Sequence, residues 1–150
     1  MSEERKEART MRKDKCELSG EVKTFVKWQL EHYPVNRREL KELRESLLEI
    51  RAADPGLLGG GETGRPTEGA AVKLGTDRYM AELARSVNAV AYVVDRLEPT
   101  DRALIELVYW RSSHTVEGAA QHLNFSKSAA YRHINGVLTA IAREMGYIPI

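Results

Sequence analysis

The chain has 150 residues, 42% of them hydrophobic, which is enough apolar material for one domain of ordinary size or for two small ones. Its formal net charge is +1, so the overall charge does not by itself require a polyanionic partner. The single cysteine, Cys16, excludes an internal disulfide, and the sequence shows neither a leader-like apolar segment nor an apolar run of about 18 residues. We therefore expect a soluble cytoplasmic protein that makes no membrane contact.

The first half of the chain predicts two helices behind a polar tail. Residues 1–17 are mostly Glu, Arg and Lys of mixed sign, so we expect a disordered or frayed tail there. Apolar residues recur at helical spacing from about 19 to 33, and Pro34 ends that pattern. Asn36 has the spacing of a cap for a second helix, which carries a narrow stripe of Leu and Ile. Residues 18–51 are thus predicted to form an N-terminal helical hairpin, whose stripe packs within the chain or against a second subunit.

Glycine and proline dominate the segment that follows. Residues 52–75 contain Asp54-Pro55-Gly56 and three consecutive glycines, and they lack apolar periodicity. This composition predicts a flexible linker and a domain boundary. A phosphate-binding loop is not expected, because no Gly-Lys-Ser/Thr ends the glycine run and no apolar strand precedes it.

Residues 76–150 predict a second helical domain, with about four helices. A helical stripe follows a cap at Thr76, Pro99 and Thr100 break it, and a new helix begins with Asp101 in its first turn. That next helix is expected to point four apolar residues inward: Leu104, Leu107, Val108 and Trp110. No segment alternates in the manner of a strand, so the whole chain is predicted to be all-α.

Residues 116–141 have the order of small, apolar and polar side chains that is typical of a helix-turn-helix. Ala120 is small enough for two helices to cross closely, and Phe125 can fill the turn between them. Asn124 stands where the chain commonly needs a left-handed residue. Ser126 then has the chemistry of an N-cap, which fixes the register of the second helix.

The second helix of this pair separates its side chains into two faces. The apolar face is expected to lie in the core: Ala130, Ile134, Val137, Leu138, Ile141 and Met145. The polar face, with Ser126 at its start, is predicted to contact double-stranded DNA: Lys127, Ser128, Tyr131, Arg132 and Asn135. Arg132 can donate two hydrogen bonds to guanine, Asn135 can pair with adenine, and Tyr131 can contact a thymine methyl group or a phosphate.

Catalytic and metal chemistry find little support in the sequence. The four histidines have no Cys or acidic neighbours at a recognised metal-ligand spacing. Cys16 lacks the His and Asn arrangement that a catalytic thiol needs. We therefore expect no metal, no cofactor and no enzyme activity.

Several segments, taken in order, carry a resemblance to a known family: Tyr33-Pro34 with Arg37-Arg38-Glu39, a glycine-rich stretch, Arg65-Pro66-Thr67-Glu68 before Ala70-Ala71-Val72, and residues 104–110 and 141–147. Together they resemble phage late-gene transcriptional regulators of the RinA/ArpU type, and the C-terminal half is similar to region 4 of bacterial sigma factors. The resemblance implies activation of late phage genes in a bacterial host cell. It places the polar face of the second helix on the promoter and gives the N-terminal helices a role in assembly or in contact with RNA polymerase.

Two other functions stay open on the sequence alone. A phage small terminase subunit that recognises packaging-site DNA would assemble into a ring of roughly eight or more copies, whereas a regulator would be a dimer or tetramer. A helical adaptor would bind RNA polymerase without contacting DNA. For a DNA-binding protein we expect a homodimer or a higher homo-oligomer, because residues 124–143 offer a modest basic face of Lys127, Arg132 and Arg143.

Overall fold

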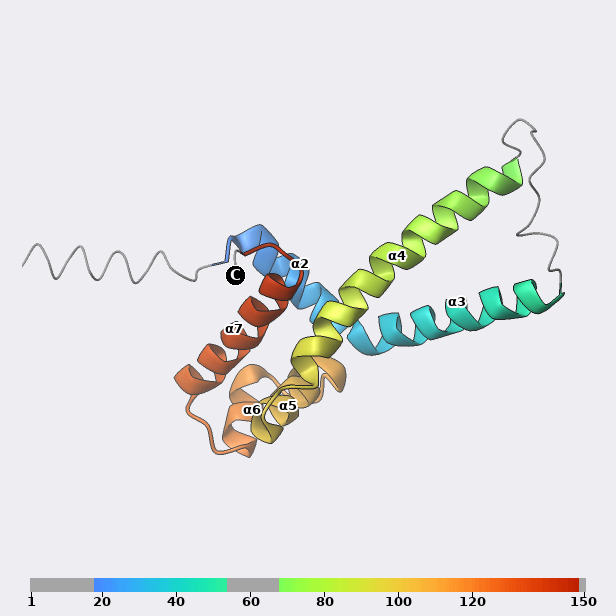
Figure 1. Cartoon of the computed structure of the whole chain (residues 1–150). Helices are drawn as coiled ribbons and strands as arrows, with labels where there is room; N and C mark the ends of the chain where they lie inside the picture. The colour runs from blue at the N-terminus through green and yellow to red at the C-terminus, as the bar shows by residue number, and fades with distance from the viewer. Residues whose placement is uncertain (1–17, 54–67, 149–150) are drawn as a thin grey trace, which may run out of the picture.

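The computed structural model describes residues 18–53 and 68–148, and all regular structure within these ranges is helical (Figure 1). In chain order the elements are α2 (Gly20–Glu31), α3 (Tyr33–Ala53), α4 (Glu68–Val94), α5 (Pro99–Ile105), the π-helical segment η2 (Glu106–Trp110), α6 (Val116–His122) and α7 (Lys127–Glu144). The predicted all-α class is thus confirmed for the described residues. None of these helices is both long and apolar enough to cross a membrane. The predicted tail, 1–17, and residues 54–67 of the predicted linker lie outside the described residues.

Helix α3 begins earlier than the sequence predicts. Its first residue is Tyr33, and Pro34 lies in its first turn, where a helix makes no use of the N–H that proline lacks. Asn36 is consequently inside the helix and buried, and the prediction that it caps this helix is wrong.

Helix α4 also begins earlier than predicted, at Glu68 instead of near Thr76. Residues 68–75 of the predicted linker are therefore helical, and so are its first two residues, Ala52 and Ala53, which end α3. Helix α3 contacts α4 more extensively than it contacts α2, so its main partner is not the helix with which a hairpin was expected. Figure 1 shows α3 and α4 both extending away from the other helices and diverging from each other toward their far ends.

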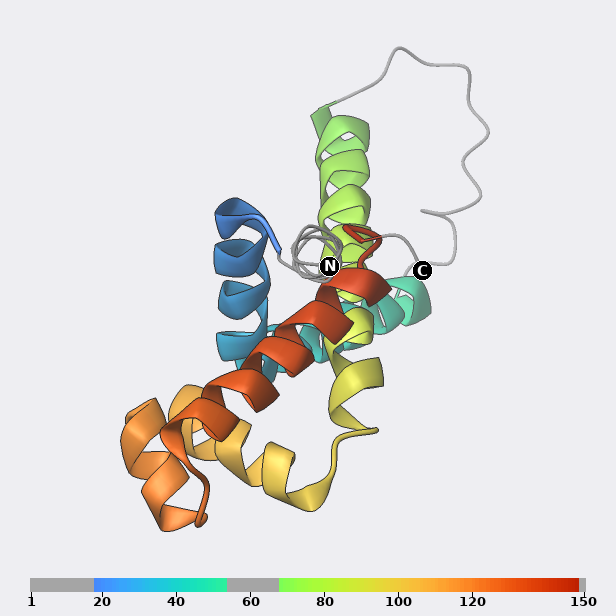
Figure 2. The ribbon, with the colours of Figure 1, turned by 90° about the vertical axis from the view of Figure 1, so that its left-hand side faces the viewer.

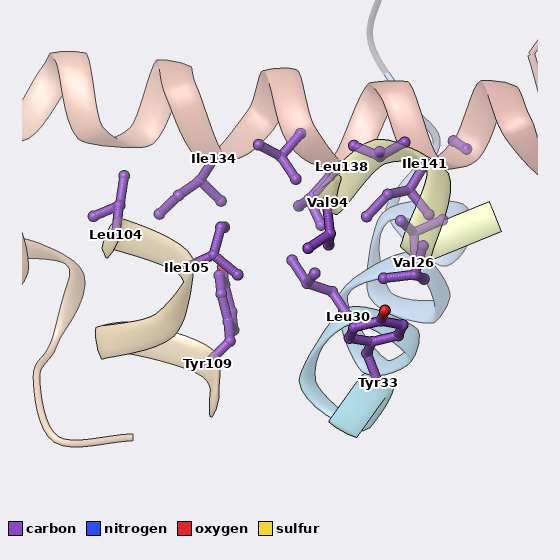
Figure 3. Packing of buried hydrophobic residues seen from close by; sticks show 14 of the residues in the cluster. Val26, Leu30, Tyr33, Val94, Leu104, Ile105, Tyr109, Ile134, Leu138 and Ile141 are labelled. Carbon is purple, nitrogen blue, oxygen red and sulfur yellow. The ribbon is translucent and has the colours of Figure 1, made fainter. Parts of the chain in front are cut away.

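Among the described residues, one hydrophobic core joins both halves of the chain (Figure 3). Val26 and Leu30 of α2 are fully buried in the same cluster as Val94 of α4 and Leu138 and Ile141 of α7. Helix α7 crosses the body with its N-terminal part beside α6 and its C-terminal part beside α2 (Figure 2). The predicted boundary within 52–75 therefore separates segments that share one core among the described residues.

The segment after α5 forms a π-helical turn, in which the amide of Arg111 donates to the carbonyl of Glu106 over 2.8 Å. The wider turn changes which side chains point inward. Leu104 is buried as predicted, but Ile105 and Tyr109 are the other buried residues of this stretch. Three residues expected to point inward are only partly buried: Leu107, Val108 and Trp110.

Candidate nucleic-acid interface

The turn between α6 and α7 is built from local signals that the sequence contains. Asn124 has a φ of 61°, which confirms the predicted left-handed residue. The Ser126 hydroxyl accepts a hydrogen bond from the amide of Ala129 at 3.1 Å, which confirms it as the N-cap of α7. Thr115 caps α6 in the same way, through the amide of Gly118 at 3.1 Å. The start of each helix is therefore fixed by a hydroxyl group.

Small residues let α6 and α7 approach each other closely. Ala119 and Ala120 of α6 are buried, and so is Ala130 of α7. A larger side chain at any of these positions would push the two helices apart or strain its own rotamer. Phe125 is partly buried in the turn, with its ring 5.0 Å from that of His133.

The two faces of α7 lie where the sequence predicts them. Met145 is half-buried. The other five predicted core residues are buried: Ala130, Ile134, Val137, Leu138 and Ile141. The predicted DNA-contacting residues, including the cap, are all exposed: Ser126, Lys127, Ser128, Tyr131, Arg132 and Asn135. They occupy the N-terminal half of the helix, so one polar surface is presented by a helix that the core holds in place.

A carboxylate that sequence reasoning missed lies within this surface. Glu117 of α6 accepts a hydrogen bond from the hydroxyl of Tyr131 at 2.9 Å, and its Oε1 lies 3.4 Å from Nζ of Lys127. Its own backbone amide, the Tyr131 hydroxyl and Lys127 hold the pKa of Glu117 below its ordinary value. The same hydrogen bond raises the pKa of Tyr131. Two of the predicted DNA-contacting residues are therefore already engaged by α6.

The remaining polar side chains of this surface are free. Ser128, Arg132 and Asn135 make no side-chain hydrogen bond or ion pair within the described part of the chain. Arg132 borders a hollow of about 340 Å³ between α7 and the α4–α5 region. In that hollow, Nδ1 of His133 lies 2.7 Å from Oδ1 of Asp101. Although residues 124–143 contain no acid, Glu117 and Asp101 from other helices thus lie against α7.

No family model, no curated protein and no solved structure matches the chain. Within residues 18–53 and 68–148, no group of three or more His, Cys, Asp or Glu side chains is placed so that it could hold a metal ion. The candidate site is therefore built from the chain's own residues, on the exposed polar face of α7.

Proposed function

We propose that the chain is a sequence-specific DNA-binding regulator of transcription, in which α6 and α7 form a helix-turn-helix and the N-terminal half of α7 enters the major groove. The observation that carries this proposal is the exposed polar face of α7, presented by a helix whose opposite face is buried in the core. In this motif the second helix lies in the groove, and its N-terminal residues contact base edges.

Arg132 and Asn135 are the residues to which we assign base recognition. Both are exposed and have no intramolecular partner among the described residues, so neither loses a contact when it meets DNA. An arginine can donate two hydrogen bonds to guanine, and an asparagine can pair with adenine in the same groove. The buried residues of α7 hold its position, which keeps these side chains in a defined orientation.

Phosphate contacts would come from the start of α7. Lys127 and Ser128 lie in its first turn, at the helix N-terminus, an end of a helix that favours anions. Because Glu117 partly offsets the charge of Lys127, one copy offers little non-specific attraction. We therefore propose that two or more copies bind one DNA, and the resemblance to phage late-gene regulators supports an activator of late genes as the particular role.

The proposal is tested by selecting binding sites for the full chain from a pool of random duplexes. We expect enrichment of a defined site that contains a G·C pair contacted by Arg132. Arg132→Ala should weaken binding to that site by about 1–3 kcal/mol and relax the preference at that base pair. Arg51→Ala removes an equal charge at the end of α3 and should leave binding unchanged.

Two results would contradict the proposal. One is the absence of any enriched site at low salt, which is what a polymerase-binding adaptor would give. The other is a similar loss of affinity in Arg132→Ala and Arg51→Ala, since that would mean that net charge alone, and not α7, governs the interaction.

A further inference from the structure

A groove of about 640 Å³ lies between α3 and α4, away from the proposed DNA-contacting residues. Leu40 of α3 and Val87 of α4 are buried at its base, and Ala91 of α4 is half-buried beside them. The base of the groove is therefore apolar, and it runs along two helices.

The α3 side of this groove is strongly basic. Two acidic side chains line the groove, Glu45 and Asp95. Four cationic side chains line it as well: Arg37, Arg38, Lys41 and Arg44. Nζ of Lys41 lies 3.9 Å from Oε1 of Glu45, so this lysine already has an acidic partner and the three arginines are the cations that remain. All three are exposed, and none has an ion pair or a side-chain hydrogen bond within the described residues. The groove thus carries an excess of unpaired, fork-shaped donors.

An exposed aliphatic residue continues the apolar base outward along α3. Leu48 lines the groove and is 64% exposed, although it lies among charged side chains. It follows Arg44 by one helical turn and Lys41 by two, so it shares their side of the helix. A large aliphatic residue next to an apolar groove is a surface that a partner can cover with a gain in free energy.

We infer that the groove between α3 and α4 binds an acidic amphipathic helix of a partner protein. Apolar residues of such a helix, recurring at intervals of three and four, would lie on Leu40, Val87 and Leu48. Its carboxylates would accept paired hydrogen bonds from the arginines at the rim. The phosphates of a nucleic acid could pair with the same arginines, but they would leave the apolar base and Leu48 uncovered. The inference goes beyond the proposed DNA binding and does not depend on it.

The experiment selects ligands for the full chain from a display library of random peptides, each about 16 residues long, enough for several helical turns. We expect the enriched peptides to be rich in Asp and Glu, with apolar residues at helical spacing. Their affinity is then measured by fluorescence anisotropy with synthetic, labelled peptides. The double variant Arg37→Glu/Arg44→Glu should bind them about tenfold more weakly or worse, with a loss that shrinks as salt is raised.

A matched control lies on the neighbouring helix. Arg78→Glu/Arg85→Glu makes the same change of charge at the same spacing of seven on α4, at exposed positions that do not line the groove, and should bind like the unchanged chain. Leu48→Lys keeps the rim basic but removes the aliphatic contact, and it should also weaken binding. Circular dichroism and thermal melting establish that each variant is folded. If the double variant Arg37→Glu/Arg44→Glu does not fold, the peptide affinity of Leu48→Lys decides whether the groove is the binding site.

Several outcomes would overturn the inference. The library could yield no peptide whose binding depends on Arg37, Arg44 or Leu48, or the enriched peptides could lack acidic residues. The groove variant could lose DNA affinity and keep peptide affinity, which would make the rim a nucleic-acid contact. The unchanged chain could be an oligomer that Arg37→Glu/Arg44→Glu dissociates, which would make a second copy the occupant. A failure of DNA binding alone affects the proposed function and not this groove.

Discussion

Glu117 places a negative charge beside the first turn of α7, within contact of both Lys127 and Tyr131. In the proposed complex this carboxylate would face phosphates and repel them. We predict that Glu117→Gln raises the affinity for duplex of random sequence several-fold at low salt, because Lys127 is released and the repulsion is removed. Anisotropy titrations over a series of salt concentrations measure this, and the gain should shrink as salt rises.

The control for this prediction is Glu82→Gln, which makes the same charge change at an exposed position of α4. Equal effects of the two variants would show that Glu117 has no special place in the interface. Because the pKa of Glu117 is lowered, its contacts persist above the ordinary carboxyl pKa and are lost only as pH falls through the lowered value. The difference in DNA affinity between Glu117→Gln and the unchanged chain should therefore stay constant between about pH 6 and pH 8.

At individual positions, the sequence predicts those features that depend on a few neighbouring residues. The conformation of Asn124 and the cap at Ser126 depend on backbone groups at most three residues away, so the local pattern contains them. The contact between Glu117 and Tyr131 joins residues 14 apart on two helices. It exists because small alanines let those helices cross closely, and no spacing rule along the chain reveals it.

At the scale of elements, η2 is tied to the end of α2. Nε1 of Trp110 donates to the carbonyl of Leu30 at 2.9 Å, and the same carbonyl also accepts from the backbone amide of His32, which caps the end of α2. We predict that Trp110→Phe lowers the free energy of unfolding by about 1–2 kcal/mol, because the hydrogen bond from the indole to that carbonyl is lost and some contact area disappears. Urea unfolding of the full chain measures the change.

Trp28 offers a matched comparison. It is 48% exposed and stacks on His32 at the surface. Trp28→Phe should therefore lower the free energy of unfolding clearly less than Trp110→Phe does. Equal losses in the two variants would mean that the indole hydrogen bond to Leu30 contributes nothing to stability.

The helix boundaries show why sequence patterns mislead at this scale. Pro34 was expected to end one helix, but a proline fits equally well in the first turn of the next, and only the path of the chain decides between them. In α4, Gly75 lies inside the helix, where it costs about 1 kcal/mol relative to alanine. Once a helix has nucleated, adding further residues to it does not require another nucleation step. A glycine-rich composition alone therefore does not determine where α4 begins.

For the whole molecule, the shared core determines what can fold alone. The sequence predicts a hairpin and a separate C-terminal domain, because each half has its own helical stripes and glycine lies between them. The packing of α2 on α4 and α7 could not be predicted, since an amphipathic stripe shows that a face is buried but not which helix covers it. The groove between α3 and α4 was missed for the same reason.

The shared core gives a prediction for a fragment that starts at Thr76 and keeps every proposed DNA-contacting residue. Without α2, the fragment loses Val26 and Leu30, which are both fully buried against the C-terminal helices (Figure 3). Burial of each such side chain contributes about 1.5–3 kcal/mol, and whole domains are stable by only about 5–15 kcal/mol. The fragment should therefore unfold at much lower urea concentration than the full chain, with a broad transition, and should bind DNA poorly.

A second fragment, residues 18–150, removes only the polar N-terminal segment and serves as the control. It keeps α2 and should unfold in one cooperative transition with the midpoint of the full chain. If the fragment from Thr76 also unfolds cooperatively at that midpoint, the N-terminal helices contribute nothing to the stability of the rest. The two halves would then be independent domains despite their contacts, and α2 and α3 could be removed without destabilising the helices that carry the proposed DNA-contacting residues.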